Sequence, residues 1–350
     1  MKKFGFLSFG HYTLNSRDIG PHSPGAKEML HDAIELSVAA GKIGVNGAYF
    51  RVHHFAPQGA APMPLLAAIA ARTQHIEVGT GVIDMRYENP LYLAEEAASL
   101  DLIANNRLAL GVSRGSPEPA KRGYEAFGYT GSTDPRGADI ARDHFDQFFR
   151  AIKGEGMARA ASAAEQYPRM YRDNAELPVL PHSPGLNSRI WWGAGSRDTA
   201  RWAGEQGTNL MSSTLLTEAN GDSFADLQAE QLNIFEEAFA VGHHGFAPRT
   251  SVSRSIFPIV SEEDRLMFGL QGQGGDQVGM IDGVTATFGK SYAAEPDKLI
   301  EQLRADPAVM KADTLMLTIP SQLGVELNLR ILQNFAEHVA PALGWEPANR

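Results

Sequence analysis

Short apolar runs alternate along the chain with longer segments of helical period. The apolar runs predict strands at 4–9, 46–51, 76–82, 107–113, 189–193, 208–213, 249–260 and 313–319. The period of 3.6 residues predicts helices at 25–43, 62–73, 89–105, 137–153, 197–206, 222–241, 295–304 and 325–340. Eight strands that each precede a helix predict an α/β protein of the (β/α)8, or TIM, barrel class.

The competing α/β architecture is a doubly wound open sheet. No Gly-x-Gly-x-x-Gly motif follows the first strand, which weakens the dinucleotide-binding form of that fold. There is no internal repeat and no interdomain linker, so we expect one domain over residues 1–350. Insertions at about 154–188 and 261–292 exceed a minimal barrel of about 250 residues. They are interpreted as lids over the C-terminal mouth or as tolerated surface insertions.

The composition excludes several functions. The formal net charge is −10, which argues against bulk affinity for nucleic acid or an anionic membrane. The absence of cysteine excludes disulfides, thiolate catalysis and cysteine-ligated metal. No run approaches the ~18 apolar residues of a membrane span, and the chain starts with a strand-like segment rather than a signal peptide. We therefore expect a cytoplasmic, soluble protein.

Two strand ends carry residues suited to an anion. Arg114 follows the strand at 107–113, and Ser196 and Thr199 lie at the helix start that follows the strand at 189–193. A guanidinium and a helix N-terminus both bind phosphate. Taken alone, Ser196 is better explained as a helix cap. Arg136, at the start of the next predicted helix after Arg114, either reaches the same anion or lies on the surface.

Candidate chemistry also lies at the ends of the second and third strands. His53 and His54 are adjacent, so at most one of them points into the barrel mouth, where it is suited to proton transfer. A metal site is a weaker interpretation, because adjacent histidines on a strand diverge. The segment Gly79–Val82 has little side-chain bulk, which suits either a flat ligand or a backbone kink.

Together these segments resemble the bacterial luciferase-like, flavin-dependent monooxygenase superfamily over nearly the whole chain. The order and spacing of the short motifs carry the resemblance. They are Val52-His53-His54-Phe55, Gly79-Thr80-Gly81-Val82 before Asn89-Pro90, Gly111-Val112-Ser113-Arg114-Gly115 and Gly193-Ala194-Gly195-Ser196.

The resemblance implies a cofactor, a site and partners. Reduced FMN, supplied by a separate reductase, would react with O2 through a C4a-(hydro)peroxyflavin and oxygenate a small aldehyde, ketone, sulfonate or similar molecule. His53 matches the catalytic histidine, and a non-proline cis peptide is expected at Gly81–Val82. A homodimer is expected through the helices after strands two and three. The residues expected at the cofactor are Gly81, Val82, Arg114, Arg136, Gly195, Ser196, Thr199 and Ser213.

Departures from the family pattern keep other functions open. Val52 replaces the glutamate that relatives often have before the two histidines, which leaves a non-catalytic flavin-binding subunit open as one alternative. An F420-dependent dehydrogenase is a second, and a metal-dependent barrel hydrolase a third. Arg51 and Arg86 add charge near the mouth, and an anionic substrate would suit them.

Overall fold

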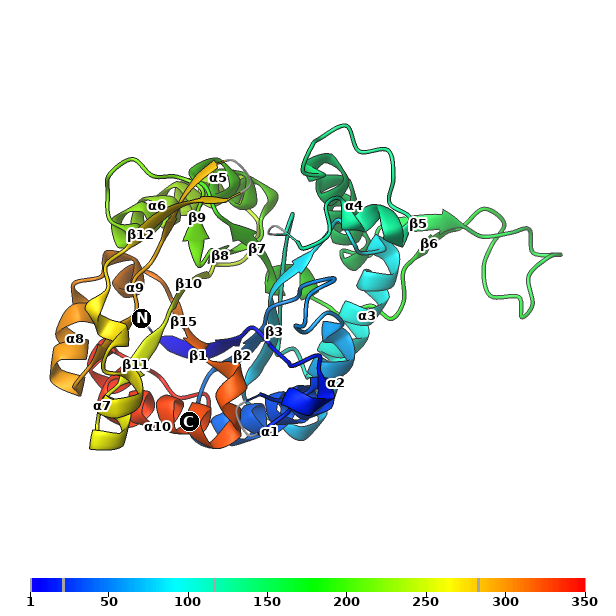
Figure 1. Ribbon diagram of the computed structural model, residues 1–350. Coiled ribbons are helices and arrows are strands. Elements are labelled where there is room, and N and C mark those ends of the chain that lie inside the picture. Colours follow the sequence, from blue (N-terminus) through cyan, green and yellow to red (C-terminus); the bar gives the residue numbers. More distant parts are fainter. Residues whose placement is uncertain (1, 21–22, 116–117, 282–283, 350) are drawn as a thin grey trace.

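The computed structural model describes residues 2–20, 23–115, 118–281 and 284–349. Its centre is a closed barrel of eight parallel strands, as predicted (Figure 1). Around the barrel the strands follow the order β1 (Lys3–Ser8), β15 (Thr314–Ile319), β10 (Thr250–Arg254), β8 (Asn209–Ser212), β7 (Ile190–Ala194), β4 (Leu108–Ser113), β3 (Glu77–Asp84) and β2 (Gly47–Phe50).

Helices follow the barrel strands and form the outer layer (Figure 1). They are α1 (Ala26–Lys42), α2 (Pro62–Arg72), α3 (Pro90–Ile103), α4 (Ala138–Ile152), α5 (Arg197–Gln206), α6 (Phe224–Gly242), α7 (Glu262–Phe268), α8 (Pro296–Arg304), α9 (Pro307–Lys311) and α10 (Gly324–His338). Short 3-10 turns are η1 (Ser16–Asp18), η2 (Gly123–Phe127), η3 (Leu186–Arg189), η4 (Gln271–Gln273), η5 (Ser321–Leu323) and η6 (Ala340–Leu343).

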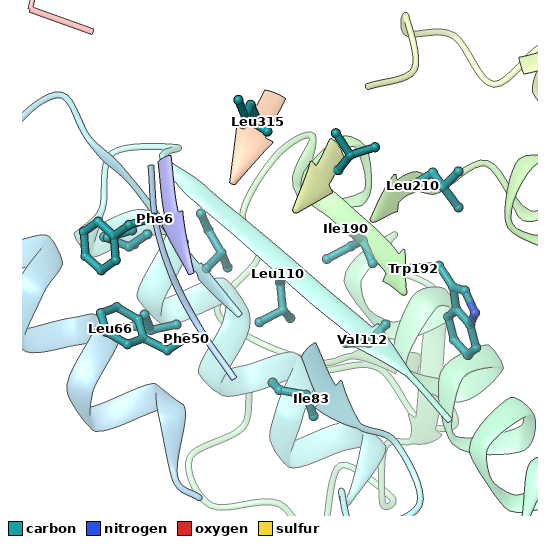
Figure 2. Packing of buried hydrophobic residues seen from close by; sticks show 14 of the residues in the cluster. Phe6, Phe50, Leu66, Ile83, Leu110, Val112, Ile190, Trp192, Leu210 and Leu315 are labelled. Carbon is teal, nitrogen blue, oxygen red and sulfur yellow. The ribbon is translucent and has the colours of Figure 1, made fainter. Parts of the chain in front are cut away.

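Successive side chains of a strand point to opposite faces, and this alternation divides the hydrophobic core into two parts. In β4, Leu108, Leu110 and Val112 belong to the large cluster between strands and helices, while Ala109 belongs to a smaller cluster inside the barrel. Figure 2 shows part of the outer cluster, with Phe50 beside Leu66 of α2. The inner cluster consists of Leu7, Tyr49, Ala109, Trp191, Met211 and Met316.

A buried polar network closes the N-terminal end of the barrel. Tyr49 donates a hydrogen bond to Glu77 over 2.9 Å, and Arg249 forms an ion pair of 2.5 Å with the same carboxylate. Arg249 also pairs with Asp313 and lies 4.8 Å from the ring centroid of Trp191. Burial alone would raise the pKa of Glu77, but Arg249 outweighs it and the pKa is lowered. The open end of the barrel is therefore the opposite, C-terminal one.

The two insertions have different places in the fold. Residues 154–188 include the antiparallel strands β5 (Gly156–Arg159) and β6 (Glu176–Pro178), which extend away from the barrel as an arm (Figure 1). None of the described residues of this segment lines the pocket at the mouth, and the choice between a lid and a surface insertion stays a prediction. In the second insertion β12 (Gln277–Ile281) and β13 (Val284–Phe288) pair, and β13 continues the sheet with β9 (Leu215–Leu216) near the mouth.

The predicted strand at 249–260 is two strands. After β10, the chain leaves the barrel wall and forms β11 (Ile256–Pro258), which pairs with β14 (Tyr292–Ala294). Ile256 and Phe257 are buried although they lie outside the barrel wall. The apolar pattern therefore continues past β10 and predicts a single strand.

Among the described residues, no helix combines the length and apolar character that a membrane crossing requires.

Glycines beside Tyr49 allow the barrel to close, and one of them provides a test. A Cβ on Gly79 would lie 2.2 Å from the carbonyl oxygen of Ala109 and 3.0 Å from the Tyr49 ring. We expect Gly79→Ala to lower the free energy of unfolding by about 1–3 kcal/mol, the usual cost of overpacking. Gly274→Ala, which would meet no atom within 4 Å, is the control and should stay within about 0.5 kcal/mol of the wild type. Denaturant titration measures both, and an equally stable Gly79→Ala variant would contradict this packing.

Candidate functional site

A pocket of about 340 Å³ lies at the C-terminal mouth. All eight residues that were expected at the cofactor line it: Gly81, Val82, Arg114, Arg136, Gly195, Ser196, Thr199 and Ser213. They come from the ends of β3, β4, β7 and β8 and from the starts of α4 and α5. His53 is absent from the lining, although its neighbours Arg51 and Val52 belong to it.

The pairing of β4 with β7 brings Arg114 and Ser196 to the same rim. The two strands are parallel, with Val112 opposite Trp192, so both chains leave the barrel at the same end. Arg114 follows β4, and Ser196 begins α5 after β7. Residues separated by about eighty positions in sequence therefore line one pocket.

The charged side chains among the described residues that line the pocket are all positive. Among the described lining residues there are four arginines, Arg51, Arg114, Arg136 and Arg142, and no acidic side chain. Within the described part of the chain, the guanidinium groups of Arg114 and Arg136 have no hydrogen-bond or ion-pair partner. Burial lowers the pKa of Arg114, and the charges of Arg136 and Arg86 lower it further. A bound anion would relieve this repulsion.

The start of α5 supplies hydroxyl groups and carries its own cap. The Ser196 Oγ accepts from the backbone N–H of Thr199 over 3.3 Å and donates to the Thr199 hydroxyl over 3.0 Å. The capping interpretation of Ser196 is therefore confirmed. Glu218 accepts a hydrogen bond from the backbone N–H of Arg197, so part of the helix terminus already has a carboxylate partner. For an anion in the pocket, the unpaired arginines contribute more than this helix end.

The wall at β3 is narrow and nearly free of side chains. The Gly81–Val82 peptide bond is cis, as expected from the family pattern. The register between β3 and β4 shifts between Thr80 and Ile83, at the same place. A Cβ on Gly81 would lie 2.9 Å from a Leu7 methyl group of the inner cluster. This wall therefore presents backbone and the Val82 side chain to the pocket, which suits a flat ring system.

His53 has a carboxylate partner that its local sequence does not reveal. Its Nδ1 lies 3.0 Å from the carboxylate of Glu118, and both side chains are nine-tenths or more buried. Glu118 belongs to the loop after β4, and it supplies the orientation that Val52 cannot. His54 instead stacks on Tyr87, and burial lowers its pKa. Neither histidine is among the described residues that line the pocket, although at most one of them was expected to point into the mouth.

Arg86 is held in the loop after β3 and does not line the pocket. Its guanidinium bonds the Asp84 carboxylate through Nε, over 2.9 and 3.1 Å, and through Nη2. Burial raises the pKa of Asp84 to about 6, against the opposing effect of Arg86. The same carboxylate packs against Gly115, whose φ of +84° and lack of a Cβ admit it there. Of the two arginines expected to favour an anionic substrate, only Arg51 lines the pocket.

In the described part of the chain, no group of three or more histidine, aspartate or glutamate side chains has the arrangement of a metal site.

The sequence profile of the luciferase-like monooxygenase family matches residues 7–264, and the chain belongs to this family. A segment of 92 residues is 36% identical to the oxygenase component of the flavin-dependent trigonelline monooxygenase of Acinetobacter baylyi, covering 26% of each chain. A segment of 91 residues is 33% identical to the F420-dependent glucose-6-phosphate dehydrogenase of Amycolatopsis mediterranei, covering 24% of this chain and 27% of that protein. The chain spans about half or less of the first curated relatives it matches.

The fold is shared with solved monooxygenases. The oxygenating constituent of 3,6-diketocamphane monooxygenase from Pseudomonas putida, solved in complex with FMN, superposes with a TM-score of 0.66. Its sequence is 18% identical, and the match covers 97% of this chain and 99% of that one. At this identity the likeness establishes the fold. Flavin-dependent and F420-dependent proteins both occur among the relatives.

Glu88, in the loop that connects β3 to α3, provides a pH-dependent test of how burial and neighbouring carboxylates affect an acidic side chain. Burial raises its pKa to about 7, and the carboxylates of Glu96 and Asp84 contribute to the rise. An unfolded glutamate titrates near pH ~4.3, so the folded state binds the proton more tightly. The stability that protonated Glu88 contributes at low pH is therefore lost as the pH rises through about 7.

We expect Glu88→Gln to raise the free energy of unfolding relative to the wild type by about 1–3 kcal/mol more at pH 8 than at pH 5. Denaturant titrations at both pH values measure the difference. An effect of equal size at the two pH values would contradict the assignment.

Proposed function

We propose that the protein is the oxygenase component of a two-component monooxygenase, which uses reduced FMN and O2 to oxygenate a small organic molecule. The observation that carries the proposal is the pocket with unpaired Arg114 and Arg136, hydroxyl groups and no acidic side chain in its described lining. A doubly charged phosphate matches two guanidinium groups. Membership of the luciferase-like monooxygenase family supports the same chemistry.

Different residues of the pocket are assigned to the phosphate and to the ring system of the cofactor. Arg114 and Arg136 would bind the phosphate, together with the hydroxyls of Ser196, Thr199 and Ser213. The Gly81–Val82 wall would support the flat ring system. Reduced flavin, when bound, supplies the electrons that activate O2 for insertion of one oxygen atom. Such chemistry requires that bulk water be kept from the reacting atoms.

Proton transfer is assigned to His53. A carboxylate accepts hydrogen bonds, so Glu118 fixes the tautomer of His53 that carries a proton on Nδ1. Proton uptake and release then fall to Nε2. Glu118 is a positioning residue in this proposal, and it also stabilises a protonated imidazole.

The proposal includes a flavin reductase as partner, since the A. baylyi relative is named as an oxygenase component. The expected homodimer stays a prediction, which the mass in solution tests.

An F420-dependent dehydrogenase is the second candidate, because relatives of that kind match the chain. It transfers hydride and needs no oxygen. Turnover that stops when O2 is removed supports the monooxygenase, and turnover that continues anaerobically with reduced or oxidised F420 supports the dehydrogenase.

Arg114→Ala tests the phosphate site. We expect it to weaken binding of reduced FMN by about 1.5–3 kcal/mol, the range of a charged hydrogen bond. This corresponds to a roughly tenfold to hundredfold rise in Kd, measured by anaerobic titration. Arg201→Ala, on an exposed position of α5, is the control and should bind like the wild type. An unchanged Kd in Arg114→Ala would count against the site.

His53→Ala tests the assignment of the proton carrier. With a reductase, FMN and a substrate found in a panel of aldehydes, ketones and sulfonates, we expect kcat to fall by about 100-fold or more, with little change in the Kd for FMN. Glu118→Gln should lower kcat by at least about tenfold and leave KM nearly constant, because it removes orientation rather than binding. Glu125→Gln, at an exposed ion pair with Arg122, is the matched control. Wild-type turnover in His53→Ala would remove His53 from the proton transfer, whereas a wild-type protein that binds FMN without any substrate-stimulated oxidation would support a non-catalytic flavin-binding subunit.

A further inference from the structure

Two methionine side chains line the pocket, and they come from barrel strands on either side of β10. Met211 of β8 is 5% exposed and Met316 of β15 is 2% exposed, and both belong to the inner cluster. The chain contains eleven methionines and no cysteine, so thioethers are the sulfur groups that an oxidant meets. Among the described lining residues, these two side chains are the only thioethers.

The sulfur of Met211 lies beside the wall that is assigned to the flat ring system. A Cβ on Gly111 would lie 2.7 Å from the Met211 Sδ and 3.0 Å from a methyl group of Val82. The absence of a side chain at Gly111 therefore leaves room for the sulfur next to Val82, where the register of β3 against β4 shifts. An oxidant that is released at this wall would meet the Met211 thioether before it reached the solvent.

We propose that hydrogen peroxide released inside the pocket oxidises Met211 and Met316 to methionine sulfoxide. This inference rests on the proposed function, because reduced flavin that reacts with O2 without oxygenating a substrate yields oxidised flavin and hydrogen peroxide. The thioether sulfur attacks one peroxide oxygen, so that an S–O bond forms, the O–O bond breaks and water leaves. The sulfur loses two electrons, which the peroxide gains.

Oxidation at these positions would weaken cofactor binding. A sulfoxide is polar, and the inner cluster around the two methionines is built from side chains such as Leu7 and Ala109. Trp191, on the neighbouring strand β7, has a buried indole N–H without a hydrogen-bond partner in the described part of the chain. A sulfoxide oxygen is an acceptor suited to this donor, so the modified side chains would be stabilised in a new arrangement beneath the ring system.

Other methionines of the chain provide internal controls. Met170 and Met280 are 67% and 68% exposed and do not line the pocket, so peroxide from bulk solution meets them first. Met85 is fully buried in the outer cluster and does not line the pocket either. Peroxide that arises in the pocket and peroxide that arrives from solution therefore predict opposite orders of oxidation.

The experiment compares these two sources of peroxide in the whole protein. Binding of reduced FMN is first measured by anaerobic titration. The protein is then incubated in air with FMN, NADH and a flavin reductase, without substrate, and catalase is added to destroy peroxide in bulk solution. A second sample without FMN receives hydrogen peroxide directly. Peptide mass spectrometry measures the sulfoxide at each methionine in both samples.

With bound flavin, we expect at least about fivefold more sulfoxide at Met211 and Met316 than at Met170 and Met280, and the reverse order with added peroxide. The Arg114→Ala variant binds less reduced FMN under the same conditions. Its sulfoxide at Met211 and Met316 should therefore fall in proportion to the bound flavin.

The double variant Met211→Leu, Met316→Leu tests the consequence for cofactor binding. Leucine has nearly the volume of methionine and contains no sulfur. After the incubation with flavin, we expect the wild type to bind reduced FMN at least about threefold more weakly and the double variant to keep its initial Kd. Met85→Leu is the matched control, because it removes a buried thioether outside the pocket, and it should lose affinity as the wild type does.

Three outcomes would overturn the inference and leave the proposed function intact. They are oxidation of the exposed methionines first under both conditions, absence of sulfoxide at Met211 and Met316 in the protein with bound flavin, and an equal loss of affinity in the double variant and the wild type. A wild-type protein that does not bind reduced FMN in the first titration would overturn the proposed function and this inference with it.

Discussion

The site depends on the parallel register of β3, β4 and β7. Gly111 makes that register possible, because a Cβ there would lie 2.3 Å from the carbonyl oxygen of Thr80 on β3. The register of β3 against β4 shifts between Thr80 and Ile83, and Gly81 and Val82 at this shift line the pocket. The next pairing, of β4 with β7, places Arg114 at the same rim as the start of α5. The same close packing of the strands that closes the barrel therefore also positions the residues of the pocket.

The pocket is positively charged, although the protein as a whole is negatively charged. The chain carries a net charge of −10, yet the described pocket lining holds four arginines and no acid. Nearby carboxylates are engaged elsewhere: Asp84 bonds Arg86, Glu118 bonds His53, and Glu218 pairs with Arg197. In these pairs the carboxylates bind side chains of the surrounding loops, and the lining of the pocket itself stays cationic. A ligand that brings its own negative charge fits this arrangement.

Much of the fold was accessible from sequence, because alternation in strands such as 107–113 and helical period between them both reflect burial. The strand ends followed, and with them Arg114, Ser196 and Thr199, while Gly195 and Ser213 were expected from the family resemblance. Three features depend on contacts between distant segments, which no local pattern encodes. They are the pairing of Glu118 with His53 across 65 positions, the direction of the arm at 154–188, and the break after Arg254. The engagement of Arg86 is different, since an aspartate two residues earlier is a local signal for it.

The central claim is that remote strand ends form one phosphate site at the open end of the barrel. The most direct measurement is a crystal structure of the protein soaked with FMN, read for the position of the phosphate. The account predicts phosphate density between the guanidinium groups of Arg114 and Arg136 and the start of α5, with the ring system against Gly81–Val82. Phosphate density at another surface, or a pocket at this rim that stays without FMN at saturating concentration, would contradict it.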